Sequence, residues 1–345
     1  MKRVRPGELR EIIVEVAVKG RLPIMIWGAP GIGKSHIVRE AASSLGMPLL
    51  DMRLNYYEES DFLGIPMRTE RGMEFVKYAK LPREGSGIWF LDELTHARTS
   101  IQGLIFQLIN DGAIEDYKVP DGWMHFVAAS NLPSHRSISN QMPAGLYSRF
   151  TGGHYELVPD IDDWASWAIT AGVDNRIISF LQYMEKNDQN RWLYRDQGDI
   201  LITPRLWATG VNHAITSLTG KTLENAIMGM IGEDAGAEFI HFIRLAGRLP
   251  DIEAIAAGDT GRLSESMDAS EKYLIVSGLA KLASRKPEML TGCLRALFSM
   301  NDEYAALGVG MLMRTVGRQA LMQNYFLISN VERFHAIMGV ADEER

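Results

Sequence analysis

The chain has 345 residues, of which 46% are hydrophobic and 23% charged, and its formal net charge is −7. This composition predicts a packed protein of two domains, with room for a small third one, and excludes long disordered tracts. The acidic balance argues against a surface devoted to wrapping nucleic acid. No apolar run reaches the roughly 18 residues that span a bilayer, and the first residues lack a signal-peptide core, so we expect a cytoplasmic protein without membrane contact. The single cysteine, Cys293, excludes an intrachain disulfide.

The first predicted elements lead into a glycine-rich loop. Apolar spacing predicts a helix over residues 8–18, and the apolar run Ile24–Trp27 predicts a strand. The next residues match the pattern G-x-x-x-x-G-K-S/T in every fixed position, which is typical of a loop whose N–H groups and helix N-terminus bind phosphates. A glycine-rich turn without a ligand is the alternative, but the flanking strand and amphipathic helix favour a nucleoside triphosphate. The predicted binding residues are Gly28, Ala29, Pro30, Gly31, Ile32, Gly33, Lys34, Ser35 and His36.

A polar stretch separates the second predicted strand from the third. Residues 49–54 have a strand pattern, whereas residues 55–87 are polar and contain a hairpin pattern around Thr69–Gly72. This segment is long for a simple connection, which favours an insertion with a function of its own.

Two acidic residues follow the next strand. The short apolar run Ile88–Leu91 is typical of a buried parallel strand, and it ends at Asp92 and Glu93. Ligands of doubly wound sheets bind at the carboxyl ends of strands, so we expect both acids to face the phosphates. An isolated Asp-Glu pair is more often a solvated helix cap, but the strand and the upstream loop reverse that preference. Asp92 is therefore the candidate Mg²⁺ ligand together with Ser35, and Glu93 is the candidate that polarises the attacking water.

The following elements continue the alternation of strands and helices. The sequence predicts a helix over residues 98–110, a hairpin over 113–123, and a buried strand over 124–131 that ends on Asn131. This alternation predicts a parallel α/β sheet. Asn131 is a candidate to orient the water or contact the γ-phosphate, and an Asx-turn is its structural alternative.

Beyond about residue 158 the pattern becomes helical, with no convincing strand. Thr203 and Pro204 are typical of a helix start. Turn residues between 249 and 262 indicate a boundary near residue 248. We therefore predict an α/β nucleotide-binding core over residues 1–158, a helical lid over 159–247 and an all-helical C-terminal region over 248–345.

Two arginines complete the candidate catalytic set. Arg149, within Tyr147–Phe150, is a candidate arginine finger for a neighbouring subunit's site, a role that raises turnover by several orders of magnitude. Arg205, directly after Pro204, is a candidate to reach the phosphates of its own chain. Without the other motifs, a surface salt bridge would be the better interpretation of either arginine.

The order of these motifs resembles that of AAA+ ATPases and, among them, the MoxR group. The resemblance covers roughly residues 8–245 and rests on the stretches 28–35, 60–64, 92–97, 128–133, 142–150 and 203–205, with Gln102 in the helix after the acidic pair. It implies a five-stranded parallel sheet in the order 5-1-4-3-2 with a helical lid, ATP hydrolysis with Mg²⁺, and a homo-oligomeric ring, usually a hexamer. It also implies that residues 64–78 and 113–123 face a central pore.

This chain departs from the group at two points. The group usually carries Asn-Arg where this chain has Thr95 and His96, which leaves the role of these two residues open. Residues 250–345 match no motif, and the form of the Ser148–Phe150 segment also recurs in DNA-handling AAA+ relatives.

Two functions remain open. The first is remodelling or chaperoning of a protein partner, which in this group is often a von Willebrand factor A-domain protein. This chain has no Asp-x-Ser-x-Ser motif, so such a partner would be a separate chain. The second is a nucleic-acid motor, such as a helicase or a translocase, which basic residues of the insertion support: Arg68, Arg71, Lys77 and Lys80. A scaffold with negligible turnover is disfavoured by the presence of both Glu93 and Arg149.

Overall fold

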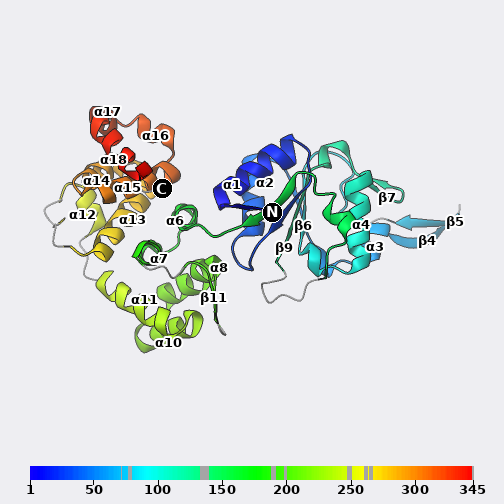
Figure 1. The fold of residues 1–345 in the computed structure, drawn as a ribbon, viewed down its shortest axis with the longest axis horizontal. Helices are drawn as coiled ribbons and strands as arrows, with labels where there is room; N and C mark the ends of the chain where they lie inside the picture. Colours follow the sequence, from blue (N-terminus) through cyan, green and yellow to red (C-terminus); the bar gives the residue numbers. More distant parts are fainter. Residues whose placement is uncertain are drawn as a thin grey trace. The chain divides into compact units, whose positions relative to one another are not determined.

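The computed structural model describes residues 1–70, 72–76, 80–132, 140–187, 192–197, 200–246, 251–259, 263 and 267–343 (Figure 1). The chain folds as two compact units, Met1–Pro159 and Asp160–Arg345. The first unit contains a parallel sheet, and the second is mainly helical. Within the described ranges, no helix is both long enough and apolar enough to cross a membrane.

The first unit is built on a six-stranded parallel sheet in the order β1-β10-β2-β9-β6-β3. Its strands are β1 (Lys2–Val4), β2 (Ile24–Trp27), β3 (Leu49–Arg53), β6 (Ile88–Asp92), β9 (Phe126–Ser130) and β10 (Gly153–Leu157). Without β1 this is the predicted order 5-1-4-3-2, which is confirmed. The predicted number of five strands is wrong, because Lys2 and Val4 pair with Tyr155 and Leu157 at the edge of the sheet. A strand of three residues is too short to show the apolar alternation by which strands are recognised.

Helices cover both faces of this sheet. Figure 1 shows α1 (Pro6–Ile12) and α2 (Lys34–Ser44) on one side and α4 (Thr99–Asp111) on the other, and α1 continues as a π-helix over Ile13–Lys19. Side chains of a strand alternate between the two faces. On the α4 side, Met25, Trp89 and Ala128 belong to one buried cluster with Ile101 and Ile105. Burial of both faces explains why the core strands are continuous apolar runs in the sequence.

The polar insertion forms the predicted hairpin. A short helix, α3 (Glu59–Leu63), precedes β4 (Ile65–Thr69) and β5 (Gly72–Val76), and the hairpin extends away from the sheet in Figure 1. Its apolar side chains are more than half exposed: Ile65, Met67, Met73, Phe75 and Val76. The second predicted hairpin is shorter than residues 113–123, since β7 (Ala113–Ile114) and β8 (Tyr117–Lys118) have two residues each and a 3₁₀ turn follows at Asp121–Trp123.

The second unit is mainly a helical assembly. Its helices are α6 (Ile161–Ala171), α7 (Asn175–Asn187), α8 (Pro204–Leu206), a π-helix (Trp207–Val211), α9 (Asn212–Ser217), α10 (Gly220–Ile231), α11 (Glu233–Ala246), α12 (Ile252–Ala256), α13 (Ala269–Arg285), α14 (Leu290–Phe298), α15 (Asp302–Thr315), α16 (Arg318–Met322), α17 (Tyr325–Ser329) and α18 (Val331–Glu343). The expectation of no strand beyond residue 158 is wrong for the part predicted as a lid, where β11 (Arg195–Gln197) pairs antiparallel with β12 (Ile200–Ile202). Each strand has only three residues, too few for a period to be visible. Thr203 caps α8 as predicted, because its side chain accepts a hydrogen bond from the backbone N of Leu206 at 3.1 Å.

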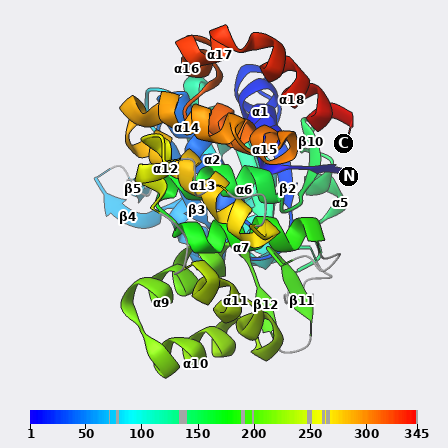
Figure 2. The ribbon, with the colours of Figure 1, turned by 90° about the vertical axis from the view of Figure 1, so that its left-hand side faces the viewer.

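One hydrophobic core extends through this unit on both sides of residue 248. Phe180 of α7 packs against Trp207 and Phe239 with ring centroids 5.9 and 5.0 Å apart, and the same buried cluster includes Leu279 of α13 and Val309 of α15. Figure 2 shows α13 among α7, α14 and α15, all of which it contacts. The division of the helical region into a lid and a C-terminal region stays a prediction.

Cys293 lies in the same core. Its side chain is fully buried, and burial raises the pKa of the thiol to about 11. This agrees with its interpretation as a small buried residue without a chemical role.

Candidate nucleotide-binding site

The glycine-rich loop joins the central strand β2 to α2. Gly33 has a left-handed backbone (φ 102°) and directly precedes α2, which begins at Lys34. A Cβ at position 33 would meet no atom within 4 Å, so glycine is needed there for the backbone conformation. A Cβ at Gly28 would lie 3.1 Å from the carbonyl oxygen of Leu157 and 2.6 Å from Cδ1 of Ile32, so a larger residue there would require the Ile32 side chain to shift. The loop therefore ends at a helix N-terminus, whose dipole favours an anion.

Lys34 is held inside the site by three oxygen atoms. Its Nζ donates to the carbonyl oxygens of Gly28 and Ala29, both at 2.9 Å, and to Oδ1 of Asn131 at 2.8 Å. Lys34 is 8% exposed and Asn131 is 9% exposed. A buried ammonium group needs such partners, because an unpaired charge away from water is costly. The contact arises because β9, which ends just before Asn131, lies beside β2 in the sheet.

Ser35 and Asp92 also meet in the site. Oγ of Ser35 donates to Oδ2 of Asp92 at 2.7 Å, and Oδ1 of Asp92 accepts from the backbone N of Glu93 at 3.0 Å. A hydroxyl and a carboxylate are both oxygen ligands, and Mg²⁺ in nucleotide sites usually takes one or two carboxylates together with phosphate oxygens. These donors fit Mg²⁺, and Ser35 and Asp92 are the residues that would hold it.

Glu93 has an unusual backbone and a close neighbour. Its φ of 59° places a non-glycine residue in the left-handed region, a conformation that is concentrated at functional sites. Its Oε2 lies 2.6 Å from Nδ1 of His96, in an approach that is off the line of a hydrogen bond. Sequence reasoning missed this partner. The signal in the sequence was that His96 follows Glu93 by three residues. In a 3₁₀ turn, here Leu94–His96, side chains three residues apart lie directly above one another.

Thr95 links the ends of two neighbouring strands. Its backbone N donates to Oγ of Ser130 at 3.2 Å, and the two hydroxyl groups also bond to each other. Because Ser130 is the last residue of β9, this link fixes the end of β6 beside Asn131. The two residues that depart from the MoxR pattern, Thr95 and His96, therefore both contact groups of the candidate site.

Arg149 follows α5 (Ala144–Tyr147) in the first unit. Its guanidinium lies over the ring of Phe106 from α4, with Cζ 5.2 Å from the ring centroid. Its Nε is buried and has no hydrogen-bond partner among the residues that the structure describes. In the described part of the chain, Arg149 forms no salt bridge, in contrast to the alternative weighed from the sequence. Stacking on an aromatic ring stabilises an arginine without using its N–H groups.

The remaining predicted residues lie less centrally. Nε2 of His36, on α2, is 3.4 Å from Oε1 of Glu40, and both side chains are over two-fifths exposed. Arg205 is an exposed residue of α8 in the second unit, and its role stays a prediction. The structure thus brings together Lys34, Ser35, Asp92, Glu93 and Asn131, whose positions were predicted from separate strand ends.

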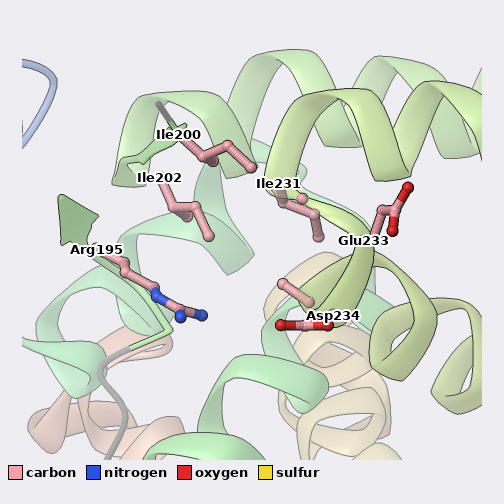
Figure 3. Close-up of a pocket in the computed structure, with 8 residues that line it drawn as sticks. Arg195, Ile200, Ile202, Ile231, Glu233 and Asp234 are labelled. Carbon is pink, nitrogen blue, oxygen red and sulfur yellow. The ribbon is translucent and has the colours of Figure 1, made fainter. Parts of the chain in front are cut away.

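The second unit contains a cavity of about 240 Å³ (Figure 3). Arg195 of β11 and Asp234 of α11 point toward one another across it, and Ile200, Ile202 and Ile231 form an apolar wall. Its lining includes none of the residues predicted for nucleotide binding or catalysis.

The site and the sheet define the class of protein. The phosphate loop follows β2, the acidic pair stands at the end of β6, and the asparagine follows β9, which lies between these two strands. The first unit therefore has the fold of an AAA+ ATPase, a class of ATP hydrolases. In agreement, residues 23–150 match the family model of the AAA domain (dynein-related subfamily).

Known proteins resemble this chain at low identity. Midasin of Giardia intestinalis is 26% identical over 176 residues, which is 48% of this chain and 4% of midasin. Protein NorQ of Paracoccus denitrificans is 26% identical over 157 residues, which is 42% of this chain and 56% of NorQ. Among solved structures, NtrX from Brucella abortus in complex with ATP aligns with a TM-score of 0.42 and 18% identity, covering 94% of this chain and 67% of that one.

Proposed function

We propose that this chain is a MoxR-like ATPase that hydrolyses ATP in a homo-oligomeric ring, most simply a cytoplasmic hexamer, and remodels or chaperones a protein partner. The observation that supports the chemistry is the convergence of Lys34 with Asn131 and of Ser35 with Asp92, next to Glu93. Transfer of a phosphoryl group to water needs held phosphates, neutralised charge and an oriented water, with little covalent work by the protein. This set offers a candidate for each requirement.

In the proposed reaction, Lys34 exchanges its two backbone carbonyl partners for oxygens of the β- and γ-phosphates. Asn131 keeps its Oδ1 on the lysine, and its amide N–H groups then donate to the γ-phosphate or to the attacking water. Ser35 and Asp92 would hold Mg²⁺, and a bound Mg²⁺ would supply positive charge for the phosphates. Glu93 accepts a hydrogen bond and then the proton of the attacking water after its carboxylate leaves His96.

In the proposed ring, two arginines add positive charge at the γ-phosphate. Arg149 of one subunit reaches the nucleotide of the next. There its guanidinium leaves the ring of Phe106 and donates hydrogen bonds to phosphate oxygens. Arg205 acts on the nucleotide of its own chain.

Steady-state phosphate release with ATP and Mg²⁺ tests the proposed activity, and Lys34→Ala tests the site. Loss of the ammonium group is expected to weaken ATP binding by about 1.5–3 kcal/mol, roughly ten- to hundredfold, because hydrogen bonds to charged groups contribute this much. Lys19→Ala is the matched control, since Lys19 is 62% exposed and its ion pair with Glu15, four residues earlier, lies on the protein surface. Unchanged affinity in Lys34→Ala, or a wild-type chain that releases no phosphate, would contradict the proposal.

Asn131→Ala is expected to separate catalysis from binding. The turnover number should fall on the order of 10²-fold, the usual cost of losing one preorganised donor, while ATP affinity changes little. Titration with a fluorescent ATP analogue measures the affinity, and phosphate release measures the turnover. Normal turnover in this variant would remove Asn131 from the mechanism.

The hairpin β4–β5 favours a protein partner. Directly opposed residues of an antiparallel pair share a face, so Ile65 and Val76 lie on one face, and Pro66 and Phe75 lie on the other. Exposed apolar surface on both faces is typical of protein interaction sites. The resemblance to the MoxR group suggests a separate von Willebrand factor A-domain protein as this partner.

A nucleic-acid motor is the second candidate, because Arg68 and Lys80 of the insertion are exposed. Arg71 and Lys77, the other basic residues of this prediction, lie outside the described residues. DNA-stimulated hydrolysis with an affinity that falls steeply with salt would favour the motor. Hydrolysis that DNA does not change at low salt would favour the protein partner.

A further inference from the structure

One imidazole ring links the strand that carries the phosphate loop to the segment that carries Arg149. His154 of β10 accepts a hydrogen bond at Nδ1 from Nε1 of Trp27, at 3.1 Å. Its Nε2 lies 3.0 Å from the carbonyl oxygen of Tyr147. The ring of Tyr147 is stacked on the imidazole with centroids 3.7 Å apart and planes within 13°.

The partners of His154 fix its protonation. The indole N–H of Trp27 can only donate, so Nδ1 must be the unprotonated nitrogen. Nε2 then carries the proton and donates to the carbonyl of Tyr147. Burial lowers the pKa of His154, which favours this neutral form. The ring is therefore a bridge with one acceptor and one donor, each used by a different element.

The two sides of the bridge belong to different parts of the proposed machinery. Trp27 is the last residue of β2 and adjoins Gly28, whose carbonyl oxygen accepts from Lys34. On the other side, Tyr147 and Phe150 flank Arg149, and Phe150 packs against the imidazole edge at 5.8 Å between centroids. Phe150 is 3% exposed, whereas Tyr147 is 46% exposed. The stack and the hydrogen bond to His154 thus hold the exposed Tyr147 beside β10, together with the bond from its backbone N to the carbonyl oxygen of Pro143.

We propose that His154 is a positioning residue for Arg149: it fixes the Tyr147–Phe150 segment to the phosphate-loop strand, so that the arginine is presented to the nucleotide bound by a second copy of this chain. This inference rests on the proposed ring ATPase. Misplacing a reacting or stabilising group by about 1 Å can cost up to roughly 10²-fold in rate, so a defect in this bridge should lower turnover rather than ATP affinity.

Two substitutions of His154 each keep one of its two hydrogen bonds and remove the other. In His154→Asn, the side-chain oxygen can take the place of Nδ1 and accept from Trp27, but the bond to Tyr147 and the ring stack are lost. In His154→Gln, the amide N–H can take the place of Nε2–H and donate to Tyr147. We expect His154→Asn to impair the presentation of Arg149 and His154→Gln to restore part of it.

Mixed rings test the assignment. A Lys34→Ala chain binds ATP roughly ten- to hundredfold more weakly but supplies Arg149, and an Arg149→Ala chain binds ATP but supplies no finger. At an ATP concentration that fills only the second chain, hydrolysis recovered on mixing comes from sites built by both. His154→Asn placed on the Lys34→Ala chain is expected to lower the recovered turnover by about tenfold or more. His154→Asn on the Arg149→Ala chain should change the recovered turnover by less than about twofold, since the hydrogen bond from Trp27 is kept. His213→Asn, at an exposed histidine of α9, is the matched control.

The outcomes are distinct. An equal loss on either chain, or a loss only on the ATP-binding chain, would overturn the positioning role of His154. No recovery from the Lys34→Ala and Arg149→Ala pair before any change at His154 would instead overturn the trans site itself. Thermal unfolding and light scattering check that each variant folds and assembles. If His154→Asn does not fold, Tyr147→Leu on either chain gives the same test, because Tyr147 is half exposed and its loss removes only the stack.

Discussion

Replacing Arg149 with alanine is expected to lower the turnover number by roughly 10³–10⁵-fold, the contribution measured for arginine fingers. ATP should still bind with nearly normal affinity, because the phosphate loop, Lys34 and Ser35 are unchanged. The expected effect is large because a guanidinium placed on the γ-phosphate stabilises charge that develops only in the transition state. Single-turnover phosphate release and equilibrium ATP binding measure the two quantities separately.

The control for this substitution is an arginine in an ordinary surface ion pair. Arg39 donates to Oδ2 of Asp51 at 2.9 Å, with its side chain 46% exposed, and Arg39→Ala should change turnover by no more than about twofold. Mixing Arg149→Ala with Lys34→Ala should restore part of the activity if the arginine acts on a neighbour. Absence of recovery in rings that contain both chains, shown by mass spectrometry, would place Arg149 outside a trans site.

Glu93→Gln is expected to lower turnover by roughly 10²–10⁴-fold, the usual contribution of a general base. The amide has nearly the same size as the carboxylate and can still orient a water, but it cannot accept the proton. ATP and Mg²⁺ should remain bound, since Ser35 and Asp92 keep their contact. Glu11→Gln, at an exposed position of α1, makes the same chemical change away from the site and should leave turnover unaltered. Full activity in Glu93→Gln would exclude this residue as the base.

The same variant offers a route to the partner. A ring that holds ATP without hydrolysing it should keep the conformation that binds its substrate. Affinity purification of Glu93→Gln with ATP, compared with Lys34→Ala, should therefore enrich the protein partner only in the first sample. Substitution of Phe75 and Val76 by serine in the hairpin should abolish the enrichment if the exposed apolar residues bind that partner.

Motifs that are continuous in the sequence predicted which side chains lie close together at the ends of the strands. Gly28–Ser35 lies on one loop, and the contact between Lys34 and Asn131 follows from the strand order once β9 is placed beside β2. Asp92 was predicted to approach Ser35 by the same reasoning, and the two residues share a hydrogen bond. Such contacts are predictable because the carboxyl ends of parallel strands meet at one edge of a sheet.

Contacts without a local pattern could not be predicted. Trp27 and His154 are 127 positions apart, and neither lies in a recognised motif of the phosphate loop. The strands β1 and β11 have only three residues each, and most of these residues are polar. Such short stretches do not show the alternation of apolar and polar residues by which a strand is recognised in a sequence. Likewise, turn residues near position 248 do not indicate whether the helices before and after them pack together. In the structure, Phe239 before this position and Leu279 after it belong to the same hydrophobic core.

The left-handed backbone of Glu93 has a cost for the stability of the chain. A left-handed conformation costs a residue with a side chain about 1–3 kcal/mol, a penalty that glycine largely avoids. Selection for thermal stability alone would favour glycine or asparagine here. Glu93 therefore lowers the folding stability of the chain in the same position where its backbone N donates to Asp92, the candidate Mg²⁺ ligand. Glu93→Gly is accordingly expected to raise the free energy of unfolding while it removes the proposed base.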